Sequence, residues 1–353
     1  MTHNIIIIGD THFGIKNNSM TWLKHQRDGF REIIQYIKSS MQEDDMVTVI
    51  HVGDLFDSRS AINPLIYREV TNLLRELDVI LGGHKDAQDR LHVGKMYIIG
   101  GNHDYYYPWE SQNNFTGIEM IPELRNITPI VNGFVRLRDM ILIPWYDFHN
   151  PVKLENALRD TGEHDVIFTH TDPYHMTKET MNLIKGHTLI TGHIHQPTSG
   201  FTPIMGIENV LVTGATFPTD FTDRNSHRGF WTIKREGQEL PSAPQLNFHP
   251  VFSSIHFHTI TEDMLEDWKE FGIKEDDYVE ILIKQSHTDQ HKATIKTLMD
   301  SFNTVITPVP DENNPVFEST EVLNVDIVCA KMLPDKLKGI YQQMVDACRK
   351  KEQ

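Results

Sequence analysis

Short runs of apolar residues, each ending in a polar motif, recur along the first part of the chain. The runs are too short for helices and are bounded by glycine or polar residues, a pattern typical of buried strands in a parallel sheet. The polar groups follow the runs at the point where a strand passes into a loop. The predicted strands are Ile5–Ile8, Met46–Val52, Met96–Gly100, Val166–Thr169 and Thr188–Thr191.

The segments between these strands carry apolar residues at helical spacing. Helices are predicted over Trp22–Ser39 and Pro64–Leu81, the second with an apolar stripe along one face. Alternating strands and helices favour a layered α/β domain, in which ligands bind beyond the carboxyl ends of the strands. Further strand candidates at Val210–Thr213 and Gly229–Lys234 predict a second sheet that completes a sandwich.

The same pattern divides the chain into three parts. We expect a catalytic domain over residues 1–250, a small α+β cap domain that faces the substrate over 251–332, and an amphipathic C-terminal helix over 333–353, opened by Pro334. Gly82–Gly94 is interpreted as a surface insertion and Pro308–Thr320 as an acidic loop. In the cap, strands and helices are expected at Ser254–His258, Thr261–Phe271, Tyr278–Lys284, Ala293–Asn303 and Val322–Cys329.

Composition and charge limit the kinds of partner and compartment. The chain has 353 residues and only two cysteines, Cys329 and Cys348, which suits a reducing cytoplasm. No apolar run approaches the ~18 residues of a membrane span, and no signal peptide is evident, so a cytoplasmic location is expected. The net charge of −16 argues against a broad nucleic-acid-binding surface. Metal ions at a carboxylate site and a basic partner subunit would offset that charge.

Polar motifs follow the predicted strands in order. With 20 His and 49 acidic residues, any one of them is expected by chance, but their joint occurrence after strands indicates a shared site. They are Gly9-Asp10-Thr11-His12, Gly53-Asp54-Leu55-Phe56-Asp57, Gly101-Asn102-His103-Asp104, His170 and Gly192-His193-Ile194-His195.

The candidate ligands in these motifs are too many for one ion. They supply carboxylate, imidazole and amide donors without thiolate, a set that suits two Mn²⁺ or Fe²⁺ ions better than a structural zinc. Mn²⁺ is the leading choice. The candidate ligands are Asp10, His12, Asp54, Asn102, His170, His193 and His195.

In order and composition these motifs resemble those of calcineurin-like metallophosphoesterases across residues 9–195. The resemblance implies a β-sandwich flanked by helices and two-metal hydrolysis of phosphate esters. It also implies that His103 lies beside the leaving oxygen as a catalytic residue and that Asp104 orients and charges it. The implied ligands are Asp10, His12, Asp54 and His195 for one metal, and Asp54, Asn102, His170 and His193 for the other, with Asp54 as the bridge.

Residues around the motifs narrow the substrate class. Asp57-Ser58-Arg59 and Asp104 differ from the protein-phosphatase pattern, so that class is disfavoured. The second motif, with Ile143-Pro144-Trp145 and Arg228-Gly229-Phe230-Trp231, resembles SbcD-type nucleases, including the recombination nuclease of T-even-like phages, to about residue 250. Archaeal and eukaryotic relatives usually have a histidine, linked to exonuclease action, in place of Asp57; the bacterial branch also has Asp.

This second resemblance implies a Mn-dependent DNA exonuclease of 3′-to-5′ polarity and endonuclease, acting in recombination and repair in a bacterial cell or phage-infected host. It implies an SbcC-type coiled-coil ATPase as partner and homodimerisation through the Pro64–Leu81 region. Residues 334–350 are expected either to dock the ATPase or to fold back onto the cap.

Alternative functions remain open from the sequence. One is a phosphodiesterase or phosphomonoesterase for nucleotides or small phosphoesters; another is a catalytically idle subunit that binds DNA ends, which the complete ligand set with His103 disfavours. Tyr105, Tyr106 and Tyr107 are expected either to stack on bases and sugars or to pack their own loop.

Overall fold

A computed structural model describes residues 2–43, 46–85, 91–106, 115–159, 162, 165–219, 223, 227–236, 245–251, 256–274 and 277–309. The chain divides into two compact units, the first ending at His256 and the second beginning at Phe257. The predicted strand Val322–Cys329, the predicted C-terminal helix, both cysteines, Tyr107 and most of the predicted acidic loop lie outside the described residues.

The first sheet of the first unit is mixed. Its parallel core is formed by the strands that follow one another along the N-terminal half of the chain, and antiparallel strands flank that core. The strand order is β13 (Leu246–Pro250), β12 (Gly229–Glu236), β1 (Thr2–Ile8), β2 (Met46–His51), β4 (Leu91–Ile99) and β3 (His84–Lys85), with β5 (Ile127–Ile130) paired to β4.

The second sheet packs against the first, and its four central strands are parallel. Its order is β10 (Thr202–Ile204), β11 (Ile207–Val212), β9 (Thr188–Thr191), β8 (Val166–Thr169), β7 (Met140–Leu142) and β6 (Val135–Leu137). The prediction that Val210–Thr213 and Gly229–Lys234 together supply the second sheet is wrong, because β12 pairs antiparallel with β1 in the first sheet. Apolar patterning identifies a strand but does not identify its distant partner.

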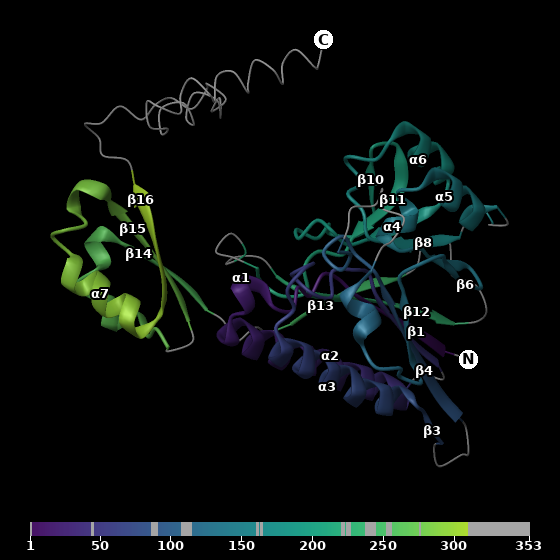
Figure 1. The fold of residues 1–353 in the computed structure, drawn as a ribbon, viewed down its shortest axis with the longest axis horizontal. Coiled ribbons are helices and arrows are strands. Elements are labelled where there is room, and N and C mark those ends of the chain that lie inside the picture. Colours follow the sequence, from purple (N-terminus) through teal and green to yellow (C-terminus); the bar gives the residue numbers. More distant parts are fainter. Residues whose placement is uncertain are drawn as a thin grey trace, which may run out of the picture. The chain divides into compact units, whose positions relative to one another are not determined.

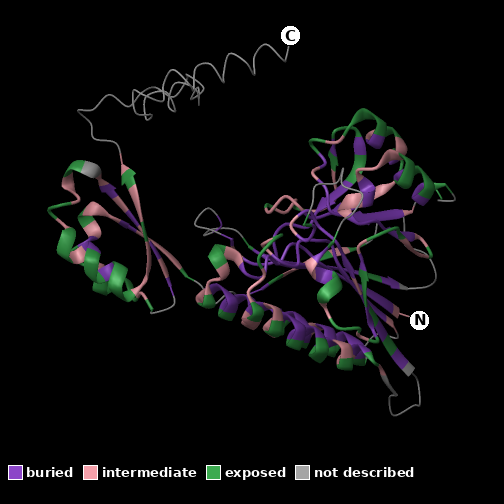
Figure 2. Cartoon of the chain, viewed as in Figure 1, coloured by how far each residue is buried: buried purple, intermediate pink, exposed green. Residues whose placement is uncertain are grey.

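Alternate residues of β1 pack in different layers of the first unit, whose sheets and helices are labelled in Figure 1. Ile5 and Ile7 pack between the two sheets, whereas Ile6 and Ile8 face the helices on the outer side of the first sheet. Figure 2 shows the strands largely buried and the outward helix faces exposed. Helices α2 (Met20–Glu43) and α3 (Pro64–Leu81) cover the first sheet; α4 (Trp145–Phe148), α5 (Pro151–Leu158) and α6 (Lys178–Leu183) lie on the second. Single turns form α1 (Ile15–Asn18) and the 3-10 helix η1 (Gly117–Met120).

Helix α3 has the bounds that its apolar stripe predicts. Asn63 accepts a hydrogen bond from the Leu65 N–H at 2.8 Å, and Pro64 occupies the first position, where no N–H partner is needed. The interpretation of Gly82–Gly94 as a surface insertion is wrong in part, because β3 and the start of β4 lie within it. Gly94 sits in β4 against Leu81, where a side chain would collide.

The second unit has a parallel sheet in the order β14 (Phe257–Thr261), β15 (Tyr278–Lys284) and β16 (Asn303–Val309). Its crossovers contain α7 (Lys292–Ser301) and the 3-10 helices η3 (Glu262–Met264), η4 (Trp268–Phe271) and η5 (Gln285–His287). The predicted helix Thr261–Phe271 is therefore two short pieces, and β16 was not predicted. Pro308 disfavours a strand from sequence, but it is tolerated here because β16 is at the edge of the described sheet.

Among the described helices, none combines the length and apolar composition that crossing a bilayer requires.

Candidate metal centre

The polar motifs meet at one edge of the sandwich because each follows a parallel strand. Asp10 and His12 come after β1, Asp54 after β2 and Asn102 after β4, all from the first sheet. His170 follows β8, and His193 and His195 follow β9, from the second sheet. Parallel neighbours end at the same edge, so the two sheets bring all seven predicted ligands together.

One group of donors forms around His12. Its Nε2 lies 3.0 Å from Nε2 of His195 and 3.6 Å from Oδ2 of Asp54. Asp10 Oδ2 lies 3.9 Å from His195 Nε2, and the three residues Asp10, His12 and His195 are close enough to share one cation. The His195 side chain is 39% exposed, so the site opens to solvent on this side.

A second group forms around His170, which is fully buried. Its Nε2 lies 2.8 Å from Oδ1 of Asn102 and 3.3 Å from Oδ2 of Asp54. His193 Nδ1 approaches the same Asn102 oxygen at 2.8 Å. Asp54 Oδ2 thus lies between the His12 and His170 rings, where it can contribute to both groups.

The loops that carry these donors have strained backbone. His12, Asp54 and His193 adopt φ values of 44°, 52° and 78°, in the left-handed region that side chains other than glycine rarely occupy. Such conformations cost about 1–3 kcal/mol each and persist only where surrounding bonds hold them. Here the His12 N–H donates to the Asp54 carbonyl at 3.0 Å, and the His193 N–H donates to the Asp10 carboxylate at 3.0 Å.

Two motif glycines, Gly101 and Gly192, lie so close to a carboxylate of another motif that no side chain would fit. A Cβ on Gly101 would collide with the Asp54 carboxylate, and a Cβ on Gly192 would collide with the Asp10 carboxylate. These contacts explain why the motifs place glycine directly before polar residues, independently of any turn.

Burial and neighbouring charges compete in setting the pKa values of the buried ligands. Burial raises the pKa of Asp10 to about 6. Burial also opposes ionisation of Asp54, but the rings of His170 and His12 hold its pKa well below the usual range. For His170, burial lowers the pKa, yet the Asp54 and Asp10 carboxylates more than compensate and raise it to about 9. His170 therefore carries a proton at neutral pH that a metal would displace.

His193 and His195 are ready to act as neutral ligands, whereas for His12 burial lowers the pKa but the hydrogen bond to Asp57 and the Asp54 and Asp10 carboxylates raise it above the usual value. Burial, followed by repulsion from a neighbouring imidazole, lowers the pKa of both His193 and His195 to about 4. Buried carboxylates and facing imidazole lone pairs, without a Lys or Arg among the seven donors, are chemically matched to divalent cations. The donor set therefore fits a pair of such metals.

His103 and Asp104 are held by separate sets of hydrogen bonds. Its Nδ1 lies 2.6 Å from the Asp57 carbonyl oxygen, which can only accept, so Nδ1 carries the hydrogen and Nε2 is left for another partner. Among the described residues, no hydrogen bond or ion pair joins Asp104 to this ring. Its carboxylate accepts from the N–H groups of Gly101 at 2.9 Å, Phe56 at 3.1 Å and Leu55 at 3.3 Å. These hydrogen bonds brace two motif loops, and the orienting role of Asp104 towards His103 stays a prediction.

Asp57 is a site residue that the motif contained but the sequence did not assign. Besides holding His103 through its carbonyl, it places its carboxylate 3.3 Å from Nδ1 of His12. This contact favours a hydrogen on Nδ1 and leaves Nε2 of His12 free for a metal. Gln26 of α2 also supports His12, donating to its carbonyl at 2.8 Å, and no sequence signal pointed to it.

A chain of polar contacts lies behind His195. Thr219 Oγ1 is 2.8 Å from the Asp223 carboxylate and 3.4 Å from Nδ1 of His195. The carboxylate accepts only, so the Thr219 hydroxyl donates to it and can accept from His195 Nδ1–H. The buried Arg228 donates to both Asp223 and the His195 carbonyl. The motif residue Arg228 is therefore a support of this ligand.

The tyrosines after Asp104 divide between packing and exposure. Tyr105 is 1% exposed and donates its hydroxyl to the Val131 carbonyl at 2.7 Å, so it packs its loop and cannot stack on a base. Tyr106 is 49% exposed.

The family comparison covers the residues of this site. A family model for calcineurin-like phosphoesterases matches residues 3–197, a span that includes every candidate ligand. Exonuclease subunit 1 of Enterobacteria phage T4 is 26% identical over 253 residues, covering 68% of this chain and 67% of the phage protein. Among solved structures, the nuclease MPE of Pseudomonas putida is 15% identical, with a TM-score of 0.27, and the match covers 59% of this chain and 73% of that one.

Proposed function

The chain belongs to the calcineurin-like phosphoesterase family, and from that premise we propose that it is a DNA nuclease that uses two divalent cations, with Mn²⁺ as the expected metal. The observation that carries the proposal is the position of Asp54, whose Oδ2 is 3.6 Å from His12 Nε2 and 3.3 Å from His170 Nε2. A carboxylate between two donor groups is what a bridged pair of ions requires.

The expected ligands are Asp10, His12, Asp54 and His195 on one side, and Asp54, Asn102, His170 and His193 on the other. Two bound cations would supply activation of water and neutralisation of phosphate charge. His103 is the proposed general acid: the Asp57 carbonyl holds its Nδ1–H, so the ring would act as the imidazolium, giving its Nε2 proton to the leaving oxygen and keeping the Nδ1 proton.

DNA is the proposed substrate, on the strength of the T4 relative, whose name describes it as an exonuclease subunit. The enzyme rival is a phosphodiesterase or phosphomonoesterase for nucleotides or other small esters, since the same metal geometry serves both classes. The chain's net charge of −16 means that DNA affinity must depend on the metals, on local contacts or on a partner.

The discriminating experiment supplies the purified chain and Mn²⁺ with 5′-labelled duplex, 5′-labelled single strands and a chromogenic phosphodiester. Proposed 3′-to-5′ digestion gives a ladder of shortened labelled strands, whereas the opposite polarity releases a labelled mononucleotide at once. His103→Ala is the matched control for contaminating nuclease. Cleavage of the small ester without any cleavage of DNA would select the rival.

We further propose that the chain acts as a subunit, with an SbcC-type coiled-coil ATPase as partner and residues 334–350 as the docking segment, and that it forms homodimers through the α3 region. The word subunit in the name of the T4 relative supports a partner. Deleting residues 333–353 should spare Mn-dependent cleavage and abolish co-purification with the ATPase. Undiminished binding of the ATPase by the truncated chain would exclude this docking segment.

A further inference from the structure

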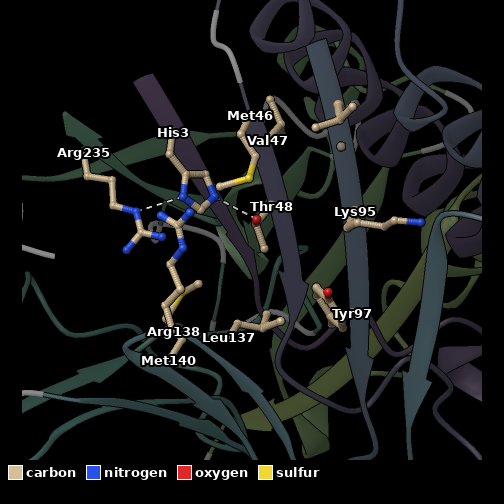
Figure 3. Close-up of a pocket in the computed structure, with 12 residues that line it drawn as sticks. His3, Met46, Val47, Thr48, Lys95, Tyr97, Leu137, Arg138, Met140 and Arg235 are labelled. Carbon is tan, nitrogen blue, oxygen red and sulfur yellow. Dashed lines mark hydrogen bonds between the residues drawn. The ribbon is translucent and has the colours of Figure 1, made fainter. Parts of the chain in front are cut away.

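A cavity of about 200 Å³ lies at the opposite end of the strands from the metal centre. It is lined by residues of β1, β2, β4 and β12 and by the turn between β6 and β7 (Figure 3). His3 and Asp10 are seven positions apart along β1 and its extension, about 20 Å at ~3.3 Å per residue. The cavity is therefore separate from the catalytic edge.

A chain of hydrogen bonds in the cavity runs from Arg235 through His3 to Thr48, and the hydroxyl group of Thr48 at its end is a donor. Arg235 Nε–H donates to Nδ1 of His3 at 2.8 Å, so the His3 hydrogen is on Nε2. That nitrogen lies 2.8 Å from Thr48 Oγ1, which therefore accepts from it. The Thr48 hydroxyl hydrogen is then left to donate, and no acceptor for it is found among the described residues.

The cavity lining is cationic although the chain as a whole is strongly acidic. His3, Lys95, Arg138 and Arg235 line it, and no Asp or Glu does. Arg235, only 3% exposed, is paired with Asp139 at 2.8 Å, whereas no carboxylate partner of Arg138 is found in the described part of the chain. Lys95 directs its ammonium away, to the Arg125 carbonyl.

His3 adds no charge to this set. Burial, and then the nearby guanidinium groups of Arg235 and Arg138, lower the pKa of His3 to about 3, so the ring is neutral at physiological pH. One positive charge, on Arg138, is left uncompensated beside the hydrogen-bond donors of Arg235 and Thr48. A single negative charge with planar acceptor oxygens would complement it, since guanidinium groups bind carboxylates through paired hydrogen bonds.

The remaining walls are apolar. Met46, Val47, Val93, Leu137 and Met140 are its aliphatic and methionine lining residues. An engineered apolar cavity of about 150 Å³ in another protein holds benzene, so the volume here suits a ring with one small substituent. We propose that this cavity binds a small organic monoanion, a carboxylate attached to an apolar body of about the size of benzoate.

Ligand-observed NMR with benzoate tests the site, in EDTA so that benzoate does not bind at the metal centre. Wild-type protein should bind benzoate with a Kd of about 1 mM or tighter. Arg138→Gln should bind it about tenfold more weakly, the effect of losing a charge-assisted hydrogen bond. Arg31→Gln, which removes the same charge from the exposed face of α2, is the matched control and should bind like wild type. Val93→Trp should block binding by filling the cavity.

Neutral and inorganic probes separate the parts of the proposal. Benzamide has nearly the same shape as benzoate, so equal binding of benzamide would overturn the requirement for an anion. Inorganic phosphate lacks the apolar body, and binding as tight as that of benzoate would overturn the apolar part. Equal benzoate affinity in wild type and Arg138→Gln, or no saturable binding below about 10 mM, would overturn the site itself.

Discussion

Replacement of Asp104 by alanine separates a bracing role from an effect on His103. The Asp104 carboxylate is 2% exposed and accepts hydrogen bonds from the N–H groups of Gly101, Leu55 and Phe56. These donors belong to the loops that carry Asp54 and Asn102. Alanine would leave three buried N–H groups without their acceptor, and each such group costs about 1–3 kcal/mol.

The expected loss of unfolding free energy is about 3 kcal/mol at the least, since water entering the space would recover only part of the bonding. For a unit of this size, that loss lowers the Tm by about 6–12 °C. Because the two loops would no longer be tied together, Mn²⁺ affinity should fall as well, and the measurements are thermal unfolding in EDTA and calorimetric metal titration.

Asp172→Ala is the matched control, because Asp172 is also a loop carboxylate of the site region, and among the described residues its hydrogen bonds stay within its own loop, at Tyr174 and His175. It should change stability by less than about 1 kcal/mol. The bracing argument is refuted if Asp104→Ala keeps the wild-type Tm and metal affinity and instead shifts only the pH dependence of cleavage, as loss of a residue that charges His103 would.

Four other changes test the remaining parts of the site. His103→Ala should lower cleavage by about 10²–10⁴-fold with metal content unchanged, as measured by single-turnover assays and metal analysis; parallel loss of metal would make His103 a ligand. Asp54→Ala should lose both ions and activity together, and a variant that still binds two ions would exclude it as the bridge. Thr219→Val should weaken metal binding about tenfold and shift the His195 ring nitrogens in NMR, with Thr219→Ser restoring both; no difference between Val and Ser would remove the hydroxyl's role. In EDTA, the raised pKa of His170 contributes up to about 3 kcal/mol of stability, which is complete below about pH 6.5 and is lost as pH rises through about 9. The Tm in EDTA should therefore fall across this range, whereas with Mn²⁺ present it should rise. A Tm in EDTA that does not fall would contradict the raised pKa of His170.

Two strands and one helix near the site could be predicted because short local sequence patterns specify them. Val166–Thr169, Thr188–Thr191 and Pro64–Leu81 have the bounds that apolar runs and a capped stripe predict. Pairing was not predictable in the same way: Gly229–Lys234 has a clear strand pattern, yet its partner β1 is more than two hundred residues away in sequence. Pairing across so long a sequence separation depends on the fold of the whole chain, so a short stretch of sequence does not reveal it.

Within the site, the motifs identified residue types better than residue contacts. Asp104 is adjacent to His103 in sequence, but adjacent side chains in a tight turn point in different directions, and its carboxylate meets Gly101 and Leu55 instead. The sequence comparison singled out Asp57 only as a position where some relatives have histidine. Its contact with His12 depends on the positive φ values at His12 and Asp54, which the sequence does not reveal. Gln26 approaches from a helix whose pattern showed only an amphipathic face.

Because the ligands are divided between two sheets, metal binding depends on the relative position of the two sheets. Asp54 comes from the first sheet and His170 from the second, so their 3.3 Å approach exists only while the sheets are in register. By linkage, each bound ion must favour that register by its own binding free energy. A change in the layer between the sheets, such as Phe168→Leu, would then lower metal affinity without touching a ligand, and high Mn²⁺ would restore its stability.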